Sequence, residues 1–324
     1  MKLLHQGSSR RPGRSIRFRM KEQSIITVLS GKGGTGKTII AANLASVIAE
    51  DYNVLLIDFD YYVRSLTTLL TSFQKHLSGA KREIDWWKVF IDSNLEGKML
   101  KTDIIEALDN ISDYLITIRK GKRSYGTIAL LPSYYEKCRR LNWVDVQPLP
   151  FSDLDRRVKL LFQNIPKEYE FVVIDTRAGS TELSLASCLN SDYSVIVMEQ
   201  DKISFDATMY LISQIQHLQA RYDSTIVYFL ALNKVERSID SSKLKGIEEA
   251  LEPFNLSFVC RYSPEIYETY GNTPFIVEEE KESSKGFRYA ILMLWKDIAS
   301  YKGIKLSSHH EKELKQLEKV YKIS

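Results

Sequence analysis

The feature that most constrains this chain is a glycine-rich octet, Gly31-Lys32-Gly33-Gly34-Thr35-Gly36-Lys37-Thr38. It fits the pattern G-x-x-x-x-G-K-[ST], in which glycine N–H groups and a helix N-terminus converge on phosphate oxygens. An apolar, β-branched run at 25–29 predicts a buried strand before the octet, and an alanine-rich run at 38–45 predicts a helix after it. In such a loop Lys37 supplies a cation for the β- and γ-phosphates, and the Thr38 hydroxyl is placed to ligate Mg²⁺. The octet therefore predicts a nucleotide-binding protein.

Strand-like and helix-like segments alternate after the octet. This order indicates an α/β fold with a mostly parallel, twisted sheet flanked by helices on both faces. Apolar runs predict strands at 53–58, 127–132, 170–175, 193–198, 225–232 and 256–260. Helical spacing predicts helices at 37–49, 153–164, 180–190, 203–220, 241–252 and 286–300. We expect one domain over 23–303, with 66–125 as a helical elaboration on it, and a helical tail over 304–324.

Composition favours a globular body over a membrane protein or a metal carrier. Of the 324 residues, 44% are hydrophobic and 27% are charged. No apolar run approaches the roughly 20 residues of a membrane-spanning helix. Cys138, Cys188 and Cys260 lie far apart and form no C-x-x-C pair, so we expect no cysteine-ligated metal. Because the N-terminus also has no apolar signal region, we expect a cytoplasmic protein with reduced thiols.

The N-terminal segment 1–22 is strongly basic, although the net charge of the whole chain is only +4. It carries seven lysines and arginines against Glu22 alone. We interpret the segment as a disordered extension, or as sequence upstream of a true start at Met20. The alternative is an arm that grips the phosphate backbone of DNA without sequence preference, or an acidic membrane surface.

Three aspartates follow predicted strands, at the sheet edge where ligands bind in this fold class. Asp58 and Asp60 lie on one side of the chain as it leaves a strand, because alternate residues share a face. Beside Mg·ATP, one such carboxylate can hold the water shell of the metal while the other orients a water for attack on the γ-phosphate. Asp175 ends another strand, and so delivers a carboxylate to the metal from a rigid element. We expect Thr38, Asp58 and Asp175 to form a magnesium site.

With its second lysine, the stretch 32–38 resembles the deviant Walker A loop, KGGxGK[TS], of the ParA/MinD ATPases. The resemblance implies a P-loop NTPase fold of the SIMIBI type. It also implies that Lys32 reaches across a dimer to the nucleotide of the partner subunit. The bland alternative for Lys32 is a solvated loop residue.

The run 55–60 resembles the MinD branch of the same family. This match implies that Asp60 activates the attacking water and that Asp58 supports the metal. The stretch 175–179 resembles the segment that moves with the γ-phosphate in MinD-like proteins. Ser65 stands where the family usually has Asn, and Tyr61-Tyr62 replaces the Pro-Gln of many partition ATPases. These departures bear on subtype and turnover rate rather than on the fold.

The tetrad Asn233-Lys234-Val235-Glu236 follows the predicted strand at 225–232. This is where the superfamily recognises the base, and an asparagine amide can bond both the donor and the acceptor edge of adenine. The tetrad also differs by one carbon from the guanine-reading pattern NKxD, so we expect ATP and keep GTP as the alternative. The resemblance further implies that Pro264 belongs to a segment that closes the adenine pocket.

Together these features predict an ATP-dependent dimerising switch that hydrolyses ATP to ADP and phosphate. Its catalytic residues would be Lys32, Lys37 and Asp60. The resemblance implies slow, partner-stimulated turnover and a role in positioning or partition, with a second copy, an activator or a cargo protein as partners and non-specific DNA as a possible platform. The alternative is an ATP-bound interaction module with vestigial hydrolysis, acting as a scaffold or regulator.

Residues 311–323 place Leu314, Leu317 and Tyr321 at helical spacing among lysines. MinD relatives end in a membrane-binding amphipathic helix, so this segment invites comparison. Its apolar stripe is thin and glutamates dilute its basic face. We therefore favour a solvated or packed terminal helix over a membrane anchor.

Overall fold

The computed structural model describes residues 23–60, 63–72, 115–120, 126–133, 149–236, 241–251, 255–270 and 273–321. The strands are β1 (Ser24–Leu29), β2 (Val54–Asp58), β3 (Ile116–Lys120), β4 (Thr127–Leu131), β5 (Phe171–Asp175), β6 (Tyr193–Met198), β7 (Val227–Val235) and β8 (Asn255–Arg261). The helices are α1 (Lys37–Ile48), α2 (Ser65–Ser72), α5 (Phe151–Gln163), α6 (Glu182–Leu189), α7 (Lys202–Tyr222), α8 (Ser241–Ala250), α9 (Pro264–Tyr270), α10 (Glu282–Tyr301) and α11 (Ser308–Tyr321), with a short 3₁₀ helix, η4 (Ile276–Glu278).

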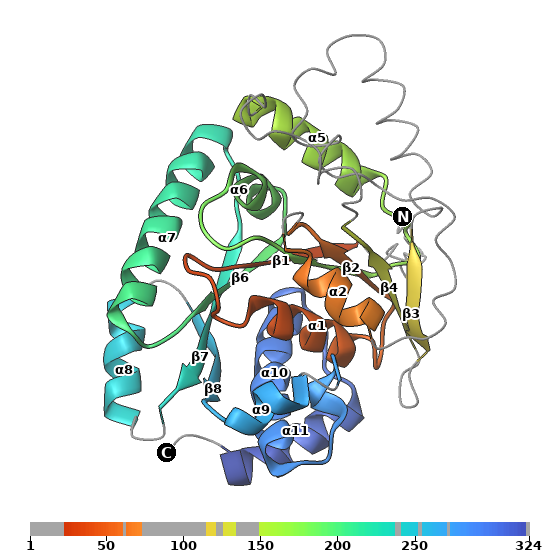
Figure 1. Ribbon diagram of the computed structural model, residues 1–324, viewed down its shortest axis with the longest axis vertical. Helices are drawn as coiled ribbons and strands as arrows, with labels where there is room; N and C mark the ends of the chain where they lie inside the picture. The colour runs from red at the N-terminus through yellow and green to blue at the C-terminus, as the bar shows by residue number, and fades with distance from the viewer. Residues whose placement is uncertain are drawn as a thin grey trace, which may run out of the picture.

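The strands form one 8-stranded sheet in the order β3-β4-β2-β5-β1-β6-β7-β8 (Figure 1). Among the described strands, only β3 runs antiparallel to its neighbour, β4, while the other strand pairs are parallel. The predicted α/β fold with a mostly parallel sheet is therefore confirmed. β1 lies between β5 and β6, so the loop that follows it emerges beside the carboxyl ends of two neighbouring strands.

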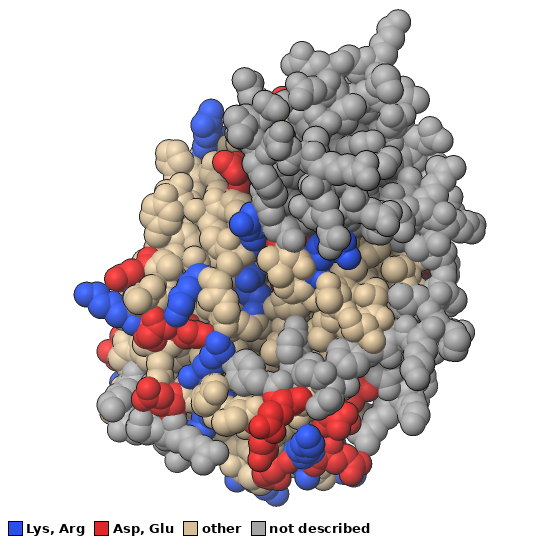
Figure 2. Space-filling model, in the orientation of Figure 1, with Lys and Arg blue, Asp and Glu red and all other residues tan. Residues whose placement is uncertain are grey.

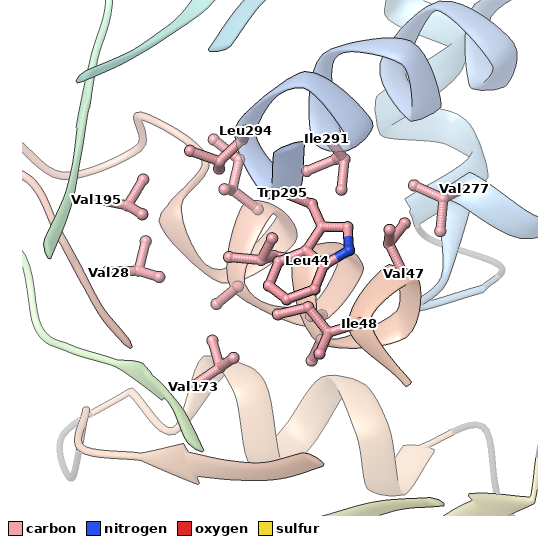
Figure 3. Close-up of a cluster of buried hydrophobic side chains, with 14 of the residues drawn as sticks. Val28, Leu44, Val47, Ile48, Val173, Val195, Val277, Ile291, Leu294 and Trp295 are labelled. Carbon is pink, nitrogen blue, oxygen red and sulfur yellow. The ribbon is translucent and has the colours of Figure 1, made fainter. Parts of the chain in front are cut away.

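One face of the sheet is covered by α1 and α10, and their contact forms the largest part of the core (Figure 3). Trp295 of α10 is only 1% exposed, and its ring meets that of Phe171 edge-on, with centroids 5.1 Å apart. The labelled side chains in Figure 3 show α1 packed between the strands and α10. This packing fixes the direction of α1, and with it the position of the loop at its N-terminus.

α11 packs on α10 rather than standing apart from the body. Leu314 is buried in the same core, and Leu317 and Tyr321 pack against it. The apolar stripe of α11 thus faces α10, which favours the packed terminal helix over a membrane anchor. No described helix is both long and apolar enough to cross a membrane.

The opposite face of the sheet is covered by α5, α6, α7 and α8, in two further clusters of buried side chains. α7 is the longest of these helices and runs past the end of β1 (Figure 1). Cys188 lies in this layer, and both it and Cys260 are buried free thiols, as their apolar sequence context predicts.

The structure differs from the sequence-based expectation in three segments. Part of the expected helical elaboration, 116–120, is the strand β3 instead, as its alternating β-branched run Ile116-Thr117-Ile118 favours. The rest of 66–125 beyond α2 and Leu115, like segment 1–22, lies outside the described residues. β7 continues three residues past the predicted end, to Val235. α9 was not predicted, because a 7-residue helix shows too little periodicity.

Candidate nucleotide-binding site

The octet connects β1 to α1, and two of its glycines occupy positions that a side chain would disturb. Gly36 is the N-cap of α1 and has a φ of 95°, in the left-handed region that favours glycine. A Cβ on Gly31 would lie 2.3 Å from the carbonyl oxygen of Ala207 on α7. The chain therefore turns tightly into the first turn of α1, whose N–H groups have no intrahelical acceptor and favour an anion.

The residues predicted to bind magnesium meet at the carboxyl ends of β2 and β5. The Thr38 hydroxyl donates to Oδ2 of Asp175 over 2.7 Å. Asp58 is paired with Asp175 in the register of β2 and β5. Oδ2 of Asp58 accepts from the backbone N–H and the hydroxyl of Thr67, at 2.8 and 2.7 Å, and its Oδ1 accepts from the Asp60 N–H at 3.0 Å.

Asp58 and Asp175 are fully buried, which makes their negative charges unfavourable. Burial raises the pKa of Asp58 to about 7, and the charge of Asp175 adds to the effect. Burial also raises the pKa of Asp175 to about 6, although Lys37 and the Thr38 hydroxyl oppose it. A bound cation would offset this excess of negative charge.

One oxygen of this cluster fits a metal ion directly. Oδ1 of Asp175 is buried and has no hydrogen-bond partner among the described residues. A carboxylate oxygen next to the Thr38 hydroxyl is a suitable ligand set for Mg²⁺, directly or through water. Asp58, whose oxygens already accept from Thr67 and Asp60, suits a supporting position. The magnesium site stays a prediction, and this arrangement supports it.

Asp60 lies two residues past the end of β2, in the turn that leads to α2. Its Oδ1 accepts from the Val63 N–H over 3.2 Å, and the side chain is half-buried. The Asp60 carboxylate thus lies near the Asp58–Asp175 cluster, and its negative charge contributes to the raised pKa of Asp175. Its role in orienting water stays a prediction.

The two lysines of the octet have different surroundings. Lys37, the first residue of α1, is 9% exposed and lies near enough to Asp175 to lower its pKa. The side chain of Lys32 is 34% exposed. Its Nζ lies 3.2 Å from Oε2 of Glu199 and 3.2 Å from Oδ2 of Asp201.

Asn233 and Lys234, near the end of β7, bind the backbone of the phosphate loop. The Asn233 amide nitrogen donates to the Thr35 carbonyl over 2.8 Å, and Lys234 Nζ donates to the Gly34 carbonyl over 2.5 Å. The register with β8 shifts at this point, and Lys234 has a φ of 56°. The Asn233 amide nitrogen is thus bonded to the phosphate loop. Recognition of both edges of adenine by Asn233 stays a prediction.

Pro264 is the first residue of α9, and two residues, Tyr262 and Ser263, connect it to the end of β8 at Arg261. It lines a cavity of about 590 Å³ whose walls come from β8, α9, α10 and the end of α11. Asn233 is not among the residues that line this cavity. The predicted contact of Pro264 with a nucleotide base is therefore left as a prediction.

Comparison with known proteins agrees with this geometry. A family model described as an AAA domain matches residues 23–228, more than half of the chain. An ATP-binding protein of Methanocaldococcus jannaschii is 23% identical over 217 residues, 65% of this chain and 75% of the relative. The septum site-determining protein MinD of Helicobacter pylori is 26% identical over 176 residues, 54% of this chain and 52% of the relative. The chain belongs to the AAA-domain family of ParA/MinD-type P-loop ATPases.

Solved structures share the fold of this ParA/MinD-type ATPase at low sequence identity. MinD of Pyrococcus horikoshii, complexed with Mg-ADP, has a TM-score of 0.57 at 18% identity, covering 88% of this chain and 100% of that one. A McdA variant from Cyanothece, complexed with ATP, has a TM-score of 0.63 at 15% identity, covering 88% and 98%. This chain spans about half the length of the Helicobacter relative, at 52%.

Sequence reasoning missed three charged residues of this ParA/MinD-type site. Glu199 and Asp201 follow β6 at the same sheet edge as Asp58 and Asp175, so the strand-end rule that found those aspartates would have found these acids too. The sequence pattern places Lys234 only in a base-reading tetrad. Its backbone has a positive φ, which a lysine rarely adopts and which the sequence does not indicate.

Proposed function

We propose that the protein is an ATP-dependent dimerising switch, in which two copies bind face to face through their phosphate loops and separate after hydrolysis. The observation that carries the proposal is the contrast between the two loop lysines. Lys37 is buried beside Asp175, where it serves the phosphates of its own subunit, whereas Lys32 is 34% exposed at the rim of the site. A second cation there is most useful to the nucleotide of a facing copy, because a charge-assisted bond strengthens when an interface excludes water.

Hydrolysis is supported by the acidic cluster beside the loop. Lys37 and the α1 N-terminus would bind the phosphates, and Thr38 and Asp175 would hold Mg²⁺. When bound, Mg²⁺ supplies charge neutralisation at the transferring phosphoryl group. Asp60 would orient the attacking water, since the oxygens of Asp58 already accept hydrogen bonds within the protein.

The nucleotide and the cellular role are inferred from relatives. The Pyrococcus MinD structure contains Mg-ADP and the Cyanothece McdA structure contains ATP, so we propose ATP over GTP here. Septum site-determining relatives, and a solved MinC:MinD complex from Aquifex aeolicus, favour a cytoplasmic protein that positions or partitions a cargo through a partner protein.

The charge distribution on the surface bears on the platform on which such a switch would act. Basic and acidic side chains are interspersed on the described part of the face in Figure 2, and acidic ones gather low in the view, where Figure 1 places α9 and α11. This distribution favours a protein partner over DNA for that face. The basic segment 1–22 keeps non-specific DNA as an alternative platform.

Sedimentation of the protein with Mg²⁺ and a slowly hydrolysed ATP analogue tests the proposal. We expect the wild type to form dimers with the ATP analogue, and not with ADP or with the matching GTP analogue. Lys32→Ala should stay monomeric under the same conditions while keeping its affinity for ADP. Lys202→Ala, which removes an exposed lysine at the start of α7, is the matched control and should dimerise. A Lys32→Ala protein that dimerises like the wild type would contradict the proposal.

A scaffold with vestigial hydrolysis remains a second candidate, and one contact favours it. The Asp60 carboxylate accepts from the Val63 N–H, as a side chain that only caps a turn would do. In that case the ATP-bound dimer would form but would not turn over, even when a partner protein, DNA or lipid is added.

A further inference from the structure

Lys32 is held within its own subunit by two carboxylates from the turn between β6 and α7. Its Nζ lies 3.2 Å from Glu199 and 3.2 Å from Asp201, which we call the acidic pair. Hydrogen bonds to Asp201 and then to Glu199 raise the pKa of Lys32, so the amine stays charged in this position. The same lysine is the group that a dimeric switch would extend toward the facing copy.

The acidic pair is itself fixed by the first turn of α7. Oδ1 of Asp201 accepts from the Ser204 N–H over 3.0 Å, which makes Asp201 the N-cap of the helix. The Glu199 N–H donates to the Ser204 hydroxyl over 2.8 Å. The Asp201 carboxylate and the backbone of Glu199 are therefore both fixed by the start of α7.

Glu199 also connects Lys32 to the loop from the other side. Its Oε1 lies 2.6 Å from Nζ of Lys234, which in turn donates to the Gly34 carbonyl. One carboxylate thus bridges a lysine on the phosphate loop and a lysine at the end of β7. The positive charge of Lys32 is therefore neutralised by carboxylates of its own subunit.

We propose that Glu199 and Asp201 act as positioning residues that restrain Lys32 in the monomer. Dimerisation has to break this contact, and the cost of breaking it opposes dimerisation until the nucleotide of a second copy takes the place of the acidic pair. This inference rests on the proposed function, because it assumes that Lys32 acts across the dimer. The restraint is weak, because the Lys32 side chain is 34% exposed and solvent-exposed ion pairs contribute little to stability. A weak restraint lowers the affinity of the dimer without preventing dimerisation.

The test is the double variant Glu199→Gln with Asp201→Asn, which removes both charges while keeping similar shapes and a side chain able to cap α7. We expect it to dimerise more tightly than the wild type with Mg²⁺ and the ATP analogue, by about 4-fold or more, because each of two subunits releases a weak contact. Affinity for ADP should not change. Equal or weaker dimerisation overturns the proposal. Weaker dimerisation would mean that the acidic pair orients Lys32 toward the partner subunit instead of restraining it.

A second measurement reads the ion pair directly in the monomer. Brief acetylation of the ADP-bound protein, followed by mass spectrometry, reports how readily the Lys32 amine reacts. Removing the acidic pair should speed this reaction, because the pKa of the amine falls toward its ordinary value and more of it is neutral. An unchanged rate overturns the proposal. Asp206→Asn with Asp223→Asn, two exposed positions on or at the end of α7, removes the same charge and should leave both measurements unchanged.

The two proposals fail in different ways. If the wild type never dimerises with the ATP analogue, the proposed switch fails, while acetylation still reports the contact of Lys32 with the acidic pair. If the wild type dimerises in a Lys32-dependent manner but the double variant is no tighter, only the restraint fails.

Discussion

Asp58 and Asp60 are two residues apart, yet their surroundings assign them different work. Asp58 is fully buried and its pKa is raised to about 7, whereas Asp60 is half-buried in a turn. We therefore expect Asp60→Ala to bind ATP as the wild type does and to release phosphate roughly 100-fold more slowly, as the loss of a water-orienting base would cause. A phosphate-release assay measures the rate, and a titration with the ATP analogue is the control for binding. Unchanged turnover would remove Asp60 from the mechanism.

At the scale of single residues, sequence located the groups whose positions follow from strand ends. Asp58 and Asp175 lie in paired positions, because carboxyl ends of parallel strands share one edge, and Thr38 at the start of α1 binds Asp175. Their role as a magnesium site stays a prediction. Side-chain contacts between distant segments were not predictable in the same way. The bond from Asn233 to the Thr35 carbonyl joins segments 198 residues apart in the chain, and no local pattern encodes it.

At the scale of elements, α11 is attached to the body by a buried ionic network centred on Arg288 of α10. Its guanidinium binds Glu50 at 2.8 Å and Glu313 of α11 at 2.6 Å, and it is nearly buried. Arg288→Met keeps a long side chain but leaves two carboxylates without their cation. We expect the free energy of unfolding to fall by about 3 kcal/mol, because an uncompensated buried charge is costly.

Urea denaturation measures that change, and limited proteolysis reports whether α11 separates from α10. Lys285→Met, on the same helix with a side chain 48% exposed, is the control and should change stability little. If both variants unfold at the same urea concentration, the network does not hold α11.

The helices themselves were largely predictable, since long amphipathic periods mark them within a few residues. β3 and α9 were not, because each is short and depends on its neighbours: β3 on pairing with the edge of β4, and α9 on the end of β8. Tertiary contact decides such segments.

At the scale of the whole molecule, Glu50 joins the end of α1 to the last two helices. Burial would raise the pKa of Glu50, but hydrogen bonds from His310 and Arg288 outweigh it and lower the pKa to about 2. A carboxyl group with a lowered pKa stabilises the folded state fully above its unfolded value of about 4.5, and this contribution is lost as the pH falls through about 2. Glu50→Gln should therefore be less stable than the wild type at pH 7, with a difference that shrinks in acid.

The urea concentration at the midpoint of unfolding, measured at neutral pH and at two pH values between about 2 and 4.5, tests this expectation. Glu249→Gln on α8, with a side chain 64% exposed, is the control and should show little difference at any pH. A Glu50→Gln difference that stays constant through the acidic range would contradict it.

The mostly parallel character of the sheet was predictable, but strand order was not, because pairing joins segments far apart in the chain.

The central position of β1 bears on how the protein is made. β1 is synthesised before the other described strands, yet its two neighbours, β5 and β6, begin only at Phe171 and Tyr193. At about 5 to 20 residues per second, the ribosome needs roughly 10 to 30 seconds to deliver β6 after β1. Thr38 likewise has no Asp175 to bind until β5 has been made. The nascent chain thus carries its phosphate loop long before the sheet around it is complete, and a product terminated before β6 lacks one of the two strands that hold β1 in place.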